Sequence, residues 1–253
     1  MCILFIALQQ HPDYPLILCA NRDEYHQRPT QAAHFWPGQP QLLAGKDLTA
    51  GGSWLGINRQ GAIAALTNIR APHLLRDNCP SRGALVINAL RHGITAQWLR
   101  QHRQEYNPFN LLYGSANGLF CCNSLSGQIQ PLTPGYHAIS NGALDDIWPK
   151  MARGTQALQQ LIGRQQTVNS NTLLDIMRDE TQANAGQLPT TGIDRAWEQK
   201  LSSIFIQHPD YGTRSTTVLL QHRTGNVEFL EVRYAPNAQA CERHRFQFSL
   251  LPS

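Results

Sequence analysis

The residues with the clearest chemical potential stand at the start of the chain, where Met1 is followed by Cys2 and the apolar run Ile3–Leu8. Cys2 is small enough for the initiator methionine to be removed, which would leave a thiol and a free α-amine on one residue. A thiolate is a strong nucleophile, and an α-amine with a pKa of about 8 can serve as its base. Position alone favours a simpler interpretation, a small apolar residue at a strand start.

A charged tetrad, Asn21-Arg22-Asp23-Glu24, ends the second apolar run and holds groups that such a nucleophile would use. If Ile3–Leu8 and Leu16–Ala20 form a hairpin around His11–Pro15, the tetrad lies close to Cys2. An arginine beside a thiolate lowers its pKa, and an aspartate can hold an α-ammonium or orient a substrate. Taken alone, the tetrad is more often a surface cluster of salt bridges.

Three further polar residues, Asn68, Asn141 and Arg214, lie where strands are predicted to end or begin. Asparagine amides there can donate to an oxyanion, although asparagine at a strand end usually makes a turn. Arg214 would bring a second positive charge to another strand edge. The segment Gly51-Gly52-Ser53-Trp54 lacks the lysine of a phosphate loop, so its glycines indicate a tight turn and not a nucleotide site.

Composition argues against several classes of partner. The 253-residue chain has a formal net charge of +4, with its arginines spread singly, so we expect no nucleic-acid partner. Its apolar runs are too short to cross a bilayer as helices, so we expect no stable membrane insertion. No basic segment precedes the first apolar run, and the six cysteines include no C-x-x-C pair. We therefore expect a cytoplasmic protein with reduced thiols and no metal site.

The elements that must position these residues follow from the hydrophobic periodicity. Besides the first hairpin, strands are predicted at 54–57, 62–66, 109–113, 119–123, 128–132, 136–140, 203–207, 216–221, 227–234 and 244–250. Helices are predicted after Ser81 and Thr95, which are the expected N-caps, and at 150–163 and 171–180. Strands first, helices between and strands last indicate two packed sheets with helices outside, in one domain over 1–253.

Together these segments resemble the NRDE family, also called the transport-and-Golgi-organisation-2 family. The matching segments are Met1-Cys2-Ile3, the tetrad with Arg28-Pro29, Gly51–Gly56, Ala65–Asn68, Leu132–Gly135, Ser140-Asn141, Trp148–Lys150 and Tyr211–Arg214 before Thr217–Leu220. They occur in family order over nearly the whole chain, and the regions 101–107 and 181–198 match less well. The family often has threonine where Ser53 stands, which keeps the hydroxyl.

The resemblance implies an α+β fold, a four-layer αββα sandwich of two mainly antiparallel sheets with outer helices, like that of N-terminal-nucleophile hydrolases. Within that superfamily the layout is most similar to the bile-salt hydrolase and penicillin V acylase group. The implied catalytic set is Cys2 as nucleophile, Arg22 as its electrostatic partner, Asp23 as a nearby acid, Asn68 and Asn141 as oxyanion donors, and Arg214 as a second charge. Such a set would cleave a non-peptide amide through an acyl-enzyme once Met1 is removed.

The same resemblance implies a second function, that of a cytosolic haem chaperone. In that interpretation the pocket holds haem, or another amphipathic small molecule, and passes it to a receiving protein. The residues that would bind the ligand are Asn21, Glu24, Trp36, Trp54 and Arg59, with Phe35 as further stacking surface and Arg22 or Arg214 as partners for propionates. The candidate axial ligands are His34, His73 and Cys2, and the sequence does not choose between them.

We rank the haem chaperone above the cysteine amidohydrolase, because family knowledge favours haem handling. No cofactor other than haem is expected. A third alternative is a folded scaffold that binds another protein, and nothing in the sequence marks its surface. Since fold does not determine function, the choice depends on the geometry of the site.

Overall fold

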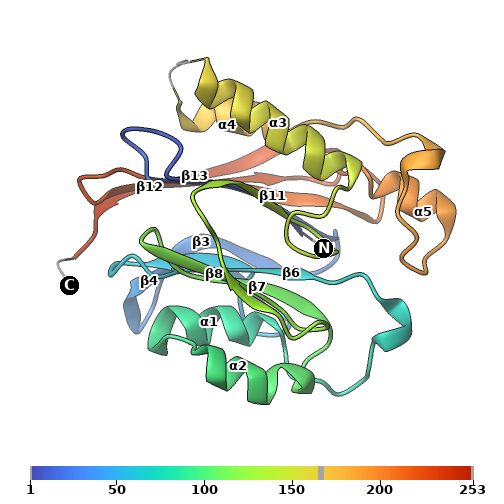
Figure 1. Cartoon of the computed structure of the whole chain (residues 1–253), viewed down its shortest axis with the longest axis horizontal. Helices are drawn as coiled ribbons and strands as arrows, with labels where there is room; N and C mark the ends of the chain where they lie inside the picture. The colour runs from blue at the N-terminus through green and yellow to red at the C-terminus, as the bar shows by residue number, and fades with distance from the viewer. Residues whose placement is uncertain (1, 165–167, 252–253) are drawn as a thin grey trace.

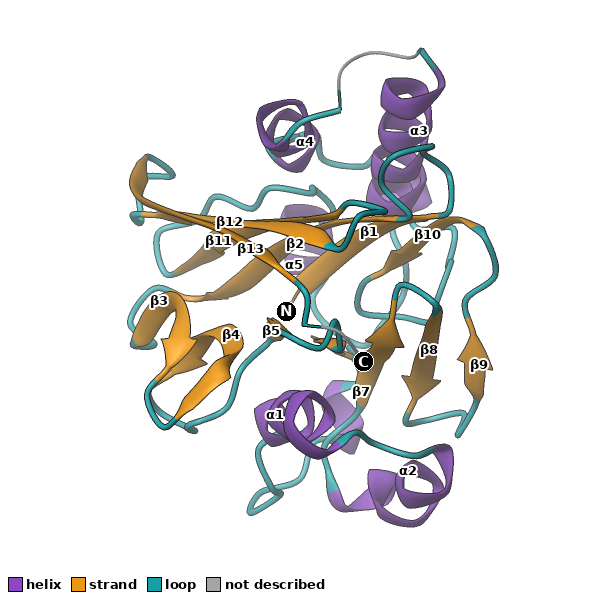
Figure 2. Cartoon of the chain, turned by 90° about the vertical axis from the view of Figure 1, so that its left-hand side faces the viewer, coloured by secondary structure: helices purple, strands orange, loops and turns teal. Residues whose placement is uncertain are grey.

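Two antiparallel sheets lie face to face with helices on their outer sides, in a computed structural model that describes residues 2–164 and 168–251 (Figure 1). The predicted four-layer αββα sandwich is confirmed. Figure 2 shows the layers from the side, with α3 and α4 over one sheet and α1 and α2 against the other. Within the described residues, we find no helix with the length and apolar composition of a bilayer span.

The first sheet has the strand order β10-β1-β2-β11-β12-β13. Its strands are β1 (Cys2–Leu8), β2 (Leu16–Tyr25), β10 (Gly135–Ile139), β11 (Tyr211–Gln221), β12 (Asn226–Tyr234) and β13 (Ala240–Ser249). The second sheet follows chain order from β3 to β9. Its strands are β3 (Thr30–Trp36), β4 (Gln39–Asp47), β5 (Leu55–Asn58), β6 (Ile63–Asn68), β7 (Phe109–Ser115), β8 (Gly118–Asn123) and β9 (Ile129–Pro131).

Four of the helices cover the outer faces of the two sheets, and α5 lies at one end of the sandwich (Figure 1). The helices are α1 (Gly83–His92), α2 (Ala96–His102), α3 (Pro149–Gly163), α4 (Ser170–Met177) and α5 (Arg195–Lys200), with short 3-10 turns at Pro72–Leu74, Arg103–Glu105 and Ala185–Gln187. Thr95 caps α2 by accepting a hydrogen bond from the backbone N–H of Trp98, as predicted. The predicted cap at Ser81 is wrong, because α1 begins two residues later and Ser81 lines a cavity instead.

Apolar residues on both faces of β1 explain why the strand reads as a continuous hydrophobic run. Leu4, Ile6 and Leu8 enter the core between the sheets. Their neighbours Ile3 and Phe5 enter a second core beneath α3 and α4. Because side chains alternate along a strand, this one seven-residue segment contributes side chains to both cores. The outer face of the second sheet forms a third core with α1 and α2.

The predicted strand at 203–207 is wrong. This segment is irregular, and its backbone groups are satisfied individually: Phe205 N–H donates to the Asp179 carbonyl, and Ile206 N–H donates to Thr213 Oγ1. Its apolar residues are buried without entering a sheet. Three elements were also missed, namely β3, β4 and α5. The first two carry mixed polar and apolar residues, and α5 is only six residues long.

Candidate functional site

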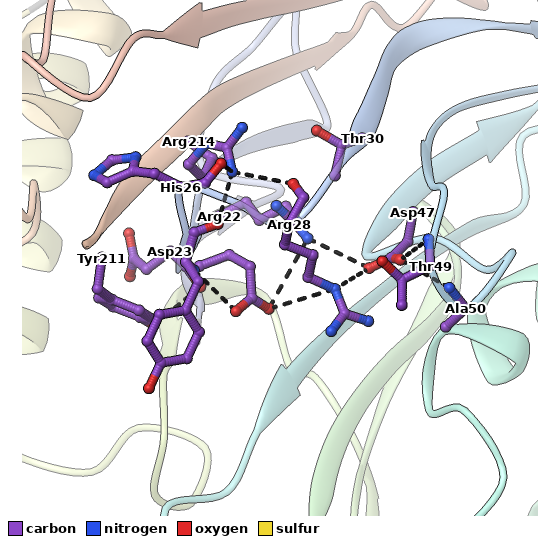
Figure 3. Close-up of polar contacts among 12 residues, drawn as sticks. Arg22, Asp23, His26, Arg28, Thr30, Asp47, Thr49, Ala50, Tyr211 and Arg214 are labelled. Atoms are coloured by element: carbon purple, nitrogen blue, oxygen red, sulfur yellow. Dashed lines mark hydrogen bonds and ion pairs between the residues drawn. The ribbon is translucent and has the colours of Figure 1, made fainter.

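A cavity of about 340 Å³ opens where the ends of β1, β2, β4 and β6 meet the segment before α1. Its charged and polar lining consists of Cys2, Arg22, Asp23, Glu24, Arg28, Asp47, Ser53, Asn68, Cys79, Ser81, Arg82 and Asn107, with Trp54 as its aromatic wall. Many of these groups come from segments far apart in the sequence. The densest set of charges comes from β2, the turn after it and the last residue of β4, namely Arg22, Asp23, Glu24, Arg28 and Asp47 (Figure 3).

The pairing of β1 with β2 confirms the predicted hairpin, and its register places Cys2 directly opposite Arg22. Burial raises the pKa of the Cys2 thiol, and the Asp23 carboxylate raises it further, while Arg22 and a hydrogen bond from the Asp23 backbone oppose the shift. The balance leaves the pKa above its ordinary value. The thiol is therefore protonated at neutral pH, and it needs a base or a metal ion to become a thiolate.

Arg22 is 5 % exposed and lies among acidic and aromatic groups. Its guanidinium carbon stands 4.5 Å from the centre of the Trp54 ring, in a cation–π arrangement. Its Nη2 atom lies 3.5 Å from Asp47 Oδ2 and 4.0 Å from Glu24 Oε2. These contacts hold the cation inside the cavity.

Arg28, which also lines the cavity, forms the tightest ion pair there. Its Nε atom donates to Asp47 Oδ2 at 2.6 Å and lies 3.9 Å from Glu24 Oε2. Burial alone would raise the pKa of Asp47, but the hydrogen bonds from Arg28 and from the N–H groups of Ala50 and Thr49 lower it below its ordinary value. Asp47 is therefore a carboxylate at neutral pH.

Asp23 lines the cavity and is held by two residues of the neighbouring strand β11. Thr213 Oγ1 donates to its carboxylate at 2.8 Å, and the Tyr211 hydroxyl donates to its carbonyl at 3.0 Å. Burial raises the pKa of Asp23, and the Lys150 ammonium and Arg22 oppose that shift. Lys150 is itself 2 % exposed, donates to the Leu201 carbonyl at 3.0 Å, and has its pKa lowered to about 8 by burial.

The two predicted oxyanion asparagines have different positions. Asn68 lines the cavity. Asn141 does not, because its Nδ2 donates to the Asn68 carbonyl at 2.8 Å and its Oδ1 accepts from Ser140 and Arg70. Asn141 therefore fixes the end of β6, on which Asn68 stands, and its amide group faces protein partners.

Asn21 lies on β2 and Arg214 on the neighbouring strand β11, and neither residue lines the cavity. Asn21 Nδ2 donates to the Met177 and Ile204 carbonyls, and its Oδ1 accepts from Thr216 on the helix-covered side of the sheet. Arg214 stands at a β-bulge in the pairing of β11 with β2. Its Nη1 donates to the carbonyls of residues 25, 26 and 28, so it holds the turn that carries Arg28.

Of the other predicted ligand-binding residues, Glu24 and Trp54 line the cavity, and Trp36 and Arg59 do not. Trp36 is buried against the second sheet, where its Nε1 donates to the Ala44 carbonyl. Arg59 stacks over Phe35 at 4.6 Å, and that ring packs edge-on against two phenylalanines of β13. His34 lies outside the cavity beside Trp36, at a ring distance of 6.3 Å, and His73 is exposed.

Sequence reasoning assigned no role to several groups of the cavity, among them Asp47 and Arg82, and it used Arg28 only as part of the family resemblance. Asp47 ends a strand that was not predicted, and Arg82 precedes α1, where its Nη1 donates to the Pro108 carbonyl. Among residues 2–164 and 168–251, no cluster of three or more histidine, cysteine or acidic residues could hold a metal ion.

Comparisons with known proteins agree with the family resemblance. The family model described as Transport and Golgi organisation 2 matches residues 1–236. The Transport and Golgi organization protein 2 homolog of Homo sapiens is 34 % identical over 255 residues, covering 91 % of this chain and 92 % of that protein. The homologue of Bos taurus is 33 % identical with the same coverage.

Solved structures share the fold at very low sequence identity. A mutant conjugated bile acid hydrolase from Clostridium perfringens has a TM-score of 0.55 and 8 % identity, covering 99 % of this chain and 92 % of that chain. The Caenorhabditis elegans ortholog of N-acylethanolamine-hydrolyzing acid amidase has a TM-score of 0.50 and 11 % identity, covering 87 % and 92 %. At these identities the likeness shows the fold alone.

Proposed function

The chain belongs to the Transport and Golgi organisation 2 family, and from that premise we propose that it is a haem-binding chaperone whose ligand enters the Cys2 cavity. The family resemblance supplies the haem hypothesis, and the proposal includes a cytoplasmic location and a protein that receives the haem. The geometry supplies the place where the ligand would bind.

One observation carries the proposal: the cavity combines a sulfur ligand, three guanidinium groups and an indole. The guanidinium groups are those of Arg22, Arg28 and Arg82, and the indole is that of Trp54. Haem iron accepts a cysteine thiolate as an axial ligand, its propionates pair with arginine, and its flat face packs on aromatic rings. Cys2 is half-buried, so an iron atom can reach its sulfur from the cavity.

The size of the cavity suits a ligand that is handed on. Small-molecule pockets usually measure about 300–1,000 Å³, so a volume of about 340 Å³ lies near the lower limit. A porphyrin placed there would keep part of its surface outside the protein. Because the raised pKa of the Cys2 thiol opposes thiolate formation, coordination would also be weak at neutral pH and would strengthen as pH rises.

Titration with haemin tests this proposal. We expect a saturable change of the Soret band with near-unit stoichiometry, and a shifted band position in Cys2→Ala. Arg22→Gln should weaken binding by about tenfold, the usual value of a lost charge-assisted hydrogen bond. The matched control is Arg59→Gln, which removes an arginine outside the cavity and should leave the affinity within twofold, a change of less than about 0.4 kcal/mol. Uptake that does not saturate, or equal affinity in all four proteins, would contradict the proposal.

A second candidate function is a cysteine amidohydrolase, favoured by the Cys2–Arg22 pairing and by a fold shared with an N-acylethanolamine-hydrolyzing acid amidase ortholog and a conjugated bile acid hydrolase. Met1 lies outside the described residues, so its removal stays a prediction. After removal, the α-amine would take the thiol proton, and the sulfur would attack the amide carbonyl. The C–N bond would break as the amine leaves with a proton, and water would then hydrolyse the thioester.

The intact mass of protein purified from its own host separates the two functions. Retention of Met1 would exclude the amidohydrolase and leave haem binding unaffected. If Met1 is absent, hydrolysis of N-acyl amides should be lost in Cys2→Ala while the thermal unfolding curve stays unchanged. Activity that survives this substitution would show that Cys2 is not the nucleophile.

A further inference from the structure

The cavity already contains an acid that pairs with two of its arginines. Asp47 Oδ2 accepts from Arg28 Nε at 2.6 Å and lies 3.5 Å from Arg22 Nη2 (Figure 3). One carboxylate oxygen, at the end of β4, therefore lies between two guanidinium groups. Arg22 carries the first on β2, and Arg28 carries the second in the turn after β2. The arrangement is that of a bound carboxylate, supplied here by the protein itself.

Arg22 is poorly satisfied by this arrangement. Charge-assisted N–H···O bonds normally measure about 2.7–2.9 Å, whereas its acidic neighbours lie at 3.5 and 4.0 Å. Its Nη1 atom is fully buried and has no hydrogen-bond acceptor among the described residues. Burying a charged donor without a partner is costly, so an acceptor that reached Arg22 directly would bind favourably.

We propose that Arg22 and Arg28 form a carboxylate-recognition site, and that Asp47 occupies this site in the ligand-free protein until the acidic group of a ligand displaces it. The inference rests on the proposed function only in that a ligand with an acidic group enters this cavity. A planar carboxylate suits the site because guanidinium groups bind it through two parallel hydrogen bonds.

The two partners differ in how firmly the fold holds them. Arg22 stands on β2, which is hydrogen-bonded to β1 on one side and β11 on the other. Asp47 is the last residue of β4, and the turn that follows it, residues 48–51, is exposed. Asp47 Oδ1 accepts from the N–H groups of Thr49 and Ala50, so the carboxylate is tied to this exposed turn. Displacement therefore moves the acid and leaves the arginine in place.

Isothermal titration with naphthoate and with its neutral counterpart naphthamide tests the inference. In Asp47→Asn the competing charge is absent, so naphthoate should bind about tenfold more tightly than in the wild type, while naphthamide affinity stays unchanged. The matched control is Asp179→Asn. Asp179 also accepts a backbone N–H two residues on and pairs with an arginine Nε at 2.9 Å, but it lies outside the cavity.

A tighter complex in Asp47→Asn, restricted to naphthoate and absent in Asp179→Asn, supports the inference. Equal or weaker naphthoate binding in Asp47→Asn would overturn it, because Asp47 would then be a positioning residue for the arginines. Equal gains for naphthoate and naphthamide would also overturn it, since the ring and not the acid would be recognised. Haemin is not used, so loss of the haem proposal would leave this result interpretable.

A measurement on the wild-type protein covers the case in which Asp47→Asn does not fold. The Arg28 Nε–H signal in NMR spectra, assigned by its loss in Arg28→Lys, reports the 2.6 Å bond to Asp47. Naphthoate should shift this signal in a saturable way as the ligand replaces Asp47, and naphthamide should not. Saturable naphthoate binding with an unmoved signal would overturn the displacement.

Discussion

The buried ion pair between Arg70 and Glu198 gives the sharpest prediction about stability. Arg70 Nη1 donates to Glu198 Oε2 at 2.5 Å, and the two side chains are 5 % and 1 % exposed. Arg70 also binds Asn141, whose amide holds the carbonyl of Asn68 at the edge of the cavity. The pair therefore connects α5 to the end of β6. Its loss should lower the free energy of unfolding and disturb the position of Asn68 in the cavity.

The substitution Glu198→Gln isolates the charge, because it keeps the size of the side chain. Both carboxylate oxygens accept hydrogen bonds: Oε2 from Arg70, and Oε1 from the N–H and hydroxyl of Thr191. The amide nitrogen of glutamine would face a donor in either orientation, and Arg70 would lose its counter-charge. Removing one partner of a buried pair costs about 3–5 kcal/mol. For a chain of this size that corresponds to a fall in Tm of roughly 10 °C.

Urea unfolding followed by circular dichroism would measure this loss, with a thermal scan as a second readout. Glu242→Gln is the matched control, since Glu242 pairs with Arg233 at 2.9 Å but is 44 % exposed. A surface pair contributes at most about 1 kcal/mol, so the control should unfold close to the wild type. Equal losses in the two variants would refute the reasoning, because burial would then have no influence on the cost.

Two further predictions concern packing and pH. Gly154→Ala should lower the free energy of unfolding in urea by about 1–3 kcal/mol, because the added methyl group would clash with the Phe5 ring. Gly163→Ala, near the end of the same helix, is the control: its methyl group meets open space and should raise that free energy by about 0.4–1 kcal/mol. The hydrogen bond that His137 Nδ1 donates to the Asp145 carboxylate raises the pKa of His137, so the stability it adds is present below about pH 6.5 and is lost as pH rises through the folded pKa. Comparing wild type with His137→Gln across pH would show this as a gap of up to about 1 kcal/mol that closes at high pH.

The sequence was sufficient for the part of the site that depends on local structure. Two apolar runs around a proline-bearing turn predicted the hairpin of β1 and β2, and the register then placed Cys2 opposite Arg22. In a hairpin the length of the turn fixes the pairing, and a one-residue shift would move every side chain to the opposite face of the sheet. The same argument recovered the hairpin of β5 and β6 and hence the position of Asn68.

Adjacency in the sequence was misleading where side chains alternate. Asn21 and Arg22 are neighbours in the tetrad, yet the first points to the helix-covered core and the second to the cavity. Arg214 was expected at the site from the family resemblance and its place at a strand edge, but it stands at a bulge and donates to backbone carbonyls of residues 25, 26 and 28. The position of Arg214 cannot be derived from residue types, because it depends on the register of β11 with β2, two strands that pair across about two hundred residues.

The pairing of acids with arginines inside the cavity was not predicted from the sequence. This pairing affects how tightly an acidic ligand can bind. Arg22 and Arg28 are balanced by two acids within 4.0 Å, Glu24 and Asp47, and the second of these comes from a strand that the sequence did not reveal. A cavity with an excess of positive charge could simply add an acidic ligand. A balanced one must give up an internal pairing when such a ligand enters, so affinity depends on how easily that pairing breaks. Asp47, the last residue before an exposed turn, holds the shortest of these ion pairs and is the carboxylate that such a ligand would have to displace.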